Sequence, residues 1–163
     1  MASKRDLIKF TPEEFEAFLE QGHTVICATN GKDGWPHLMP LWYVLRPSGP
    51  DGATEVWAWT FAKSQKTRNL ERDPRATLQI ETGEEYQELR GVMLETKVVL
   101  HHDTDDVLGV GLEVFGKYTP GLEGELADEV KAMVRKQAEK RVALQFVEHR
   151  RTSWDHRKLG GVY

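Results

Sequence analysis

Two hydrophobic patterns run along the chain, and each predicts one kind of element. Short β-branched runs and stretches where apolar and polar residues alternate predict strands, and apolar positions at helical spacing predict helices. The strands are predicted over residues 23–29, 35–45, 55–61, 75–81, 88–100 and 141–148, with a Pro/Gly loop at 46–54 and a bend or bulge at Gly91. The helices are predicted over residues 11–22, 62–72, 103–117 and 123–140, with Met133 facing inward in the last of them.

Most of the predicted strands follow one another through tight turns, without a helix between them. This order is typical of an antiparallel sheet and differs from the alternating strand–helix order of a dinucleotide-binding fold. We therefore expect a mainly β (α+β) single domain over residues 1–163, with six antiparallel strands closed into a small barrel and helices packed outside.

The strand at residues 35–45 has an unusual composition. It follows the turn sequence Asn-Gly-Lys-Asp-Gly at residues 30–34, which favours a hairpin. Pro36 and Pro40 fall on the same face of this strand and lack the N–H group that a central strand needs. The strand is therefore expected at an edge or next to a bulge, where backbone groups remain available to a ligand.

Composition and charge narrow the classes of function. The net charge of −4 argues against a general nucleic-acid binder, which needs a basic face. Cys27 is the only cysteine, which excludes a disulfide or a thiolate zinc site within the chain. Without a long apolar run or a signal-peptide pattern, the sequence predicts a cytoplasmic protein that does not contact membranes. Rossmann, P-loop, nucleophile-elbow and zincin motifs are also absent.

The segment Lys63-Ser64-Gln65-Lys66-Thr67-Arg68 carries the most distinctive chemistry. It follows a predicted strand and begins a helix, where unpaired backbone N–H groups and the helix dipole attract anions. Lys66 and Arg68 add positive charge where it opposes the dipole, and a bound phosphate would offset that cost. The alternative is an ordinary solvated helix start.

The remaining candidates each have two interpretations. His101 and His102 are adjacent on a strand and point to opposite faces, so we expect no metal site there. His37 could contact a ligand or lie in solvent. Trp57 and Trp59 are expected in the core or in a dimer interface. The tail at residues 154–163 could be docked or loose.

Three stretches resemble the pyridoxamine 5′-phosphate oxidase-like split β-barrel proteins, in particular the actinobacterial subgroup that uses the deazaflavin coenzyme F420 or FMN. They are the hairpin at residues 25–44 with NGKDGWPHLMPLWYV, the block at 60–76 with KSQKTRNLERDPRA, and the strand at 91–100. The vitamin B6 oxidases of that family carry Ser-Arg-Lys where this chain has Ser64-Gln65-Lys66, which argues against vitamin B6 oxidation.

The resemblance implies a split barrel that forms a homodimer, with two coenzyme sites at the subunit interface. It also implies the residues that bind the coenzyme. Ser64, Gln65 and Lys66 would hold the coenzyme phosphate, with Thr60 at the end of the preceding strand. The tricyclic ring would lie along His37, Leu38, Met39 and Pro40. Tyr86 would come from the partner subunit.

The expected function is an F420H2-dependent reductase that transfers a hydride to an unsaturated or conjugated small molecule. The coenzyme carries the hydride, so the sequence needs no nucleophile of its own and identifies no catalytic residue. Basic residues such as Lys63, Arg68 or Arg157 would attract the polyglutamate tail of F420, which FMN lacks. The alternatives are an FMN-dependent oxidase or reductase, and a non-catalytic binder of flavin, F420 or haem, with His37 or His101 as haem ligands.

Overall fold

The computed structural model describes residues 3–48, 52–121 and 124–160. Part of the 46–54 segment, the start of the helix expected at 123 and the last residues of the tail, including Tyr163, lie outside the described residues. Seven strands form one sheet: β1 (Val25–Asn30), β2 (Pro36–Leu41), β3 (Val44–Ser48), β4 (Ala53–Phe61), β5 (Arg75–Thr82), β6 (Arg90–His101) and β7 (Arg141–Asp155).

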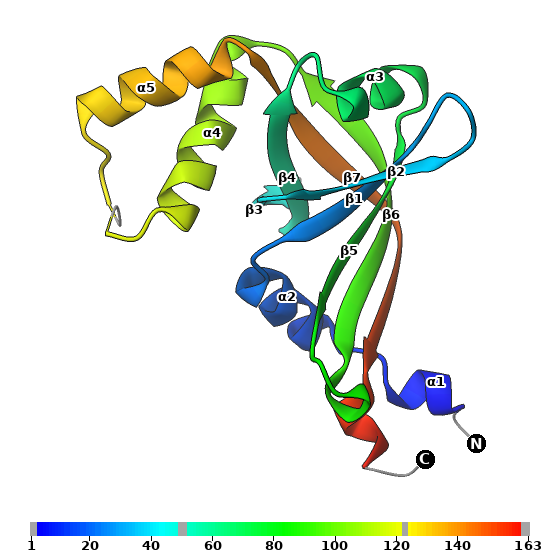
Figure 1. Cartoon of the computed structure of the whole chain (residues 1–163). Coiled ribbons are helices and arrows are strands. Elements are labelled where there is room, and N and C mark those ends of the chain that lie inside the picture. The colour runs from blue at the N-terminus through cyan, green and yellow to red at the C-terminus, as the bar shows by residue number, and fades with distance from the viewer. Residues whose placement is uncertain (1–2, 49–51, 122–123, 161–163) are drawn as a thin grey trace.

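The sheet is antiparallel throughout, and its strand order is β2-β1-β5-β6-β7-β4-β3 (Figure 1). It curls as a split barrel but does not close, because β2 and β3 form its two edges. The mainly β, antiparallel class is confirmed. The expected count of six strands is wrong, and so is the expected closure.

The count differs because residues 35–45 do not form a single strand. β2 ends at Leu41, and after Trp42 and Tyr43 the chain enters β3 at the opposite edge. Tyr43 has no exposed surface, and its hydroxyl donates to the carbonyl of Leu19 at 2.5 Å. This tertiary contact divides an apolar run that periodicity alone makes continuous. The prediction that the proline-containing strand lies at an edge is confirmed by β2.

The segment expected as a loop at residues 46–54 is also shorter than predicted. Residues 46–48 extend β3, and Arg46 pairs with Glu55 on β4 in the hairpin register. The guanidinium of Arg46 stacks 4.7 Å from the ring centre of Trp57 and binds the carboxylate of Glu113 at 2.7 Å. These contacts hold a proline-containing stretch in an extended conformation.

The helices lie around the sheet, with α4 and α5 side by side and α3 and α2 at other positions (Figure 1). They are α1 (Lys4–Leu7), α2 (Pro12–Gln21), α3 (Gln65–Arg72), α4 (Thr104–Tyr118) and α5 (Asp128–Ala138), with 3-10 turns η1 (Tyr86–Glu88) and η2 (His156–Leu159). The capping box of α2 is present: Thr11 accepts from the N–H of Glu14, and Glu14 accepts from the N–H of Thr11. The helix expected at 123–140 is shorter, and Met133, expected to face inward, is half-exposed.

Two groups of buried apolar side chains hold the fold together. The larger fills the interior of the curled sheet and includes Phe18, Leu78 and Phe146. The smaller lies between α4 and the outer face of β4, where Trp57 and Trp59 pack against it. The core placement expected for these two tryptophans is therefore confirmed in part, since both remain partly exposed.

The C-terminal end of β7 is docked rather than loose. Asp155 is buried and pairs with Arg90 and Arg157, and Lys158 binds Glu14 at 2.5 Å. In the parts of the chain that the structure describes, no helix has the length and apolar character needed to cross a bilayer.

Candidate functional site

The start of α3 is built by hydroxyl groups that cap it. Ser64 is the N-cap residue, and its side-chain oxygen accepts from the N–H of Thr67 at 3.2 Å. The Thr67 hydroxyl in turn donates to the carbonyl of Phe61, the last residue of β4, at 3.0 Å. The helix therefore begins directly at the end of β4, and its first turn leaves backbone N–H groups without intrahelical partners.

Lys66 points into the interior of the sheet. It is 4% exposed, and its ammonium group donates to the hydroxyl of Thr60 at 3.3 Å. Burial lowers the pKa of Lys66, and burial raises the pKa of the neighbouring Cys27 thiol to about 12, so this thiol is neutral. Among the described residues, no carboxylate forms an ion pair with Lys66. A buried cation without a counter-charge is costly for a fold.

A buried amide connects α3 to the hairpin that carries β2. Asn69, fully buried on α3, donates to the hydroxyl of Thr29 on β1 at 3.1 Å, and Gln65 donates to the oxygen of Asn69 at 2.9 Å. Thr29 pairs with His37 across the β1–β2 ladder. The start of α3 and the edge strand β2 are thus held on the same part of the sheet.

The edge strand β2 presents mostly exposed side chains. Leu38 is 56% exposed and Met39 is 44% exposed, and Pro40 is exposed as well. His37 is partly buried, and its Nδ1 atom is buried without a hydrogen-bond partner among the described residues. Apolar surface beside an unpaired ring nitrogen is suited to contact with a flat, polar-edged ligand.

The structure brings eight of the nine predicted site residues into one region. Thr60, Ser64, Gln65 and Lys66 lie at the junction of β4 and α3, and residues 37–40 lie on β2, beside the strand to which α3 is tied. Tyr86 is the exception. It lies on η1, its ring 4.6 Å from that of His156 on η2, and this end of the sheet is opposite to α3 (Figure 1).

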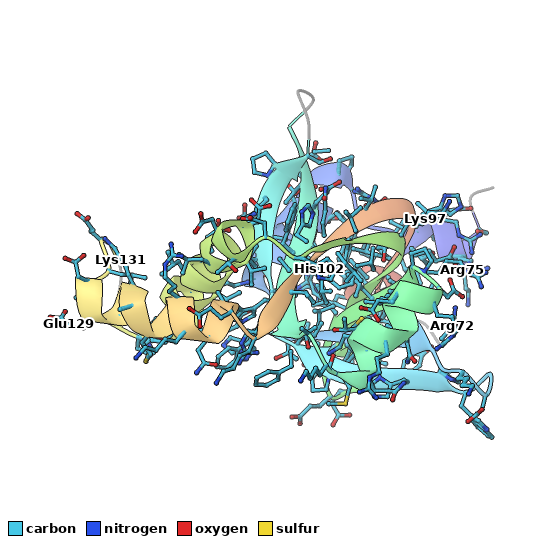
Figure 2. All side chains as sticks on the ribbon, turned by 90° about the horizontal axis from the view of Figure 1, so that it is seen from above. Arg72, Arg75, Lys97, His102, Glu129 and Lys131 are labelled. Atoms are coloured by element: carbon cyan, nitrogen blue, oxygen red, sulfur yellow. The ribbon has the colours of Figure 1, made fainter. Side chains whose placement is uncertain are left out.

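The basic residues expected near the coenzyme also lie at two different places, beside α3 and at the opposite end of the sheet. Lys63 and Arg68 are exposed beside the start of α3. Arg157 lies on η2, at the opposite end from α3, and is bound to Asp155 (Figure 1). Sequence reasoning missed a further basic group that Figure 2 shows gathered on one side of the molecule: Arg72, Arg75 and Lys97.

The histidines considered as metal or haem ligands have other partners or surroundings. The Nε2 atom of His101 lies 3.0 Å from the side-chain oxygen of Gln145, and its ring stacks 4.9 Å from that of Trp57. His102 is exposed, and the Asp103 that follows caps α4 by accepting from the N–H groups of Asp105 and Asp106. Among the described residues, no group of three or more His, Cys, Asp or Glu side chains is arranged to hold a metal ion.

One pocket lies beside this region, between the end of β2 and the side chains of β4 and β7. Its volume is about 410 Å³, and its lining residues are Thr24, Pro40, Leu41, Trp42, Trp59 and Arg141. Larger hollows of about 620 and 660 Å³ lie under α4 and between α2 and β5, and none of the predicted site residues lines them. Sequence reasoning missed Arg141, because a single arginine at the start of an alternating strand gives no signal of a ligand.

The residues present fit a coenzyme that has a phosphate and a flat ring. A helix start and a buried ammonium without a carboxylate partner among the described residues suit the phosphate, and the exposed apolar strand beside the buried His37 Nδ1 suits the ring. The structure thus provides the donors and the surface that such a group requires.

Comparison with known proteins identifies the family. Residues 11–151 match the family model described as pyridoxamine 5′-phosphate oxidase, so the chain belongs to that family. A search of curated proteins found no match.

Solved structures give the same fold. The conserved hypothetical protein Rv2991 from Mycobacterium tuberculosis is 39% identical over 99% of this chain and 95% of its own, with a TM-score of 0.84. An F420 reductase is 17% identical over 87% of this chain and 98% of its own, with a TM-score of 0.64. The haem storage protein HutZ from Vibrio cholerae is 13% identical over 85% of this chain and 90% of its own, with a TM-score of 0.62.

Proposed function

We propose that this protein is a cytoplasmic F420H2-dependent reductase that transfers a hydride to an unsaturated or conjugated small molecule. The observation that carries the proposal is the buried ammonium group of Lys66 at the start of α3. No carboxylate of the described residues forms an ion pair with this group. An anionic group bound there would supply the missing counter-charge. The family and the structural likeness to an F420 reductase support a redox coenzyme as that anion.

The chain's own residues would bind and orient. The first-turn N–H groups of α3, with Gln65 and Lys66, would hold the phosphate, and residues 37–40 would lie along the ring, with the unpaired Nδ1 of His37 at its polar edge. The coenzyme, when bound, supplies the hydride. Electrostatics and a fixed orientation are then what the protein contributes to the reaction.

The charge distribution favours F420 over FMN. Lys63 and Arg68 are exposed beside α3, and Arg72, Arg75 and Lys97 gather on one side of the molecule (Figure 2). Arg75 is already paired with Asp73 at 2.7 Å, whereas no carboxylate of the described residues forms an ion pair with Arg72 or Lys97. An acidic tail of the kind that F420 carries would pair with these two cations, whereas FMN would not extend beyond its phosphate.

We propose a homodimer as the functional unit. Exposed apolar side chains occur on β2 and also on β6 and β7, where Val99 is 45% exposed and Val147 is 37% exposed. Such surface is typical of an interaction site. A partner subunit would also explain the position of Tyr86, which lies at the end of its own chain opposite to α3 and would reach the partner's coenzyme.

The test is to purify the protein from a host that makes both F420 and flavins, and to identify the bound coenzyme by its spectrum. Oxidation of F420H2 is then followed with a panel of conjugated acceptors. F420 in the purified protein and acceptor-dependent oxidation would support the proposal. A flavin spectrum would instead indicate the FMN-dependent enzyme, and coenzyme binding without turnover of any acceptor would indicate a binding protein.

A further inference from the structure

The pocket between the end of β2 and the side chains of β4 and β7 has flat, apolar walls. Trp42 stacks on Tyr118 with ring centres 4.6 Å apart and planes 6° apart, and 52% of its surface is exposed. Trp59 packs closely against Gly111 of α4, because a Cβ atom at position 111 would lie 2.5 Å from the indole ring. Pro40 adds a further apolar wall. Rigid aromatic walls of this kind suit a planar ligand.

The same pocket has one charged group, the guanidinium of Arg141. It lies 4.5 Å from the ring centre of Trp59 and 4.0 Å from that of Phe61. Its Nη2 atom donates to Gln137 at 3.3 Å, and its Nε atom is buried without an acceptor. Burial lowers the pKa of Arg141, although an arginine remains charged at neutral pH.

The other arginine that stacks on a tryptophan has a carboxylate partner. Arg46 lies over Trp57 and also binds the carboxylate of Glu113 at 2.7 Å. No carboxylate of the described residues forms an ion pair with Arg141. A partly desolvated guanidinium with unused donors favours a carboxylate, which can bind it through two parallel hydrogen bonds.

The pocket is adjacent to the region proposed for the coenzyme. Arg141 pairs with Phe61 across the β4–β7 ladder, and Phe61 comes three residues before Ser64. Pro40 belongs both to the wall of the pocket and to the strand proposed to follow the coenzyme ring. A molecule held in the pocket would therefore lie next to that ring.

We propose that this pocket binds the substrate and that the substrate is a planar conjugated carboxylate. Its carboxylate would bind Arg141, and its conjugated body would lie against Trp42, Trp59 and Pro40. The assignment as substrate rests on the proposed reductase function, but the binding site itself does not. Reduction of such a compound adds one hydride and one proton across its C=C bond, and the reduced coenzyme releases both, losing two electrons and two protons in all.

Binding is tested on the coenzyme-free protein with trans-cinnamate as the probe, by calorimetry or by quenching of tryptophan fluorescence. Cinnamamide, which has the same shape without the charge, is the matched ligand. The variants are Arg141→Gln and, as a control that also removes one positive charge, Lys140→Gln at the exposed neighbouring position. We expect cinnamate to bind about tenfold or more tightly than cinnamamide, and Arg141→Gln to abolish that difference. Lys140→Gln should leave it unchanged.

Equal affinity for the two ligands, or an unchanged preference in Arg141→Gln, would overturn the proposal. So would displacement of cinnamate by F420 or FMN in a competitive manner, since the pocket would then belong to the coenzyme. Should Arg141→Gln fail to fold, Trp42→Leu removes a half-exposed wall and should weaken cinnamate and cinnamamide alike. If cinnamate binds as expected while no coenzyme binds, the reductase function fails and the carboxylate site stands.

Discussion

The ammonium group of Lys66 lies 3.3 Å from the hydroxyl of Thr60, and Lys66 is almost entirely enclosed by the sheet and α3. Among the residues that the structure describes, this hydrogen bond to a neutral group is the one made by the buried cation. A single hydroxyl cannot replace the water that a charged amine loses on burial. The arrangement therefore costs stability in the free protein and favours an anion at the start of α3.

Lys66→Met keeps the length and apolar volume of the side chain and removes its charge. We expect the coenzyme-free variant to be more stable than the wild type by about 1–3 kcal/mol, because the uncompensated charge is gone. Coenzyme affinity should fall by about 1–3 kcal/mol, the range of a charge-assisted contact. Urea denaturation measures the first effect and coenzyme titration the second; a variant that is both less stable and equally able to bind would contradict the assignment.

The pH dependence of stability follows from the lowered pKa of Lys66. The unfolded chain binds this proton up to about pH 10.5, its ordinary value, whereas the folded protein releases it at a lower pH. Stability of the wild type relative to Lys66→Met should therefore be lowest at neutral pH and rise as pH increases from the folded pKa toward 10.5. Denaturation of both proteins between pH 7 and pH 10 measures this, and parallel curves would show that Lys66 is not buried as a cation.

Two glycines of α4 form a matched pair that tests how closely Trp59 is packed in the wall of the pocket proposed to bind a carboxylate. A Cβ atom at Gly111 would lie 2.5 Å from the Trp59 ring, whereas at Gly116 it would meet nothing within 4 Å. Gly116→Ala should stabilise the helix by about 0.5–1 kcal/mol through its higher helix propensity. Gly111→Ala should destabilise the protein by about 1–3 kcal/mol through overpacking. Thermal denaturation compares the two, and a stabilising Gly111→Ala would contradict the close packing of Trp59.

Tyr43→Phe tests the crossover that separates β2 from β3. The substitution removes the hydroxyl that donates to the carbonyl of Leu19 in the buried interior. We expect a loss of about 1–3 kcal/mol, because the carbonyl would be left buried without this donor. Chemical denaturation gives the value. A loss near zero would show that this bond does not hold the two edges of the sheet in place.

Much of the fold could be predicted because its signals are local. The capping box at Thr11 and Glu14 and the cap at Ser64 depend on residues three apart in sequence, and the structure shows both. Pro36 and Pro40 indicated an edge strand because a proline cannot donate to a second neighbour. Each of these features requires only a few neighbouring residues.

The errors, and the features that the sequence did not predict, arose where distant residues decide the structure. The division of residues 35–45 depends on the contact of Tyr43 with Leu19, and the burial of Lys66 depends on Thr60 and on the enclosing sheet. Gly91 was expected to bend its strand. Instead, a Cβ atom there would lie 2.2 Å from Trp154, and the register shift in that strand falls at Glu95 and Thr96. None of these contacts has a signature in a short stretch of sequence.

The most direct test of the central claim is equilibrium titration of the purified protein with F420, followed by coenzyme fluorescence, for the wild type and for Lys66→Met. We expect the wild type to bind F420 at micromolar concentration and the variant to lose about tenfold or more in affinity, the equivalent of about 1.4 kcal/mol. Failure of the wild type to bind F420, or identical affinities in the two proteins, would contradict the claim that the start of α3 holds an anionic redox coenzyme.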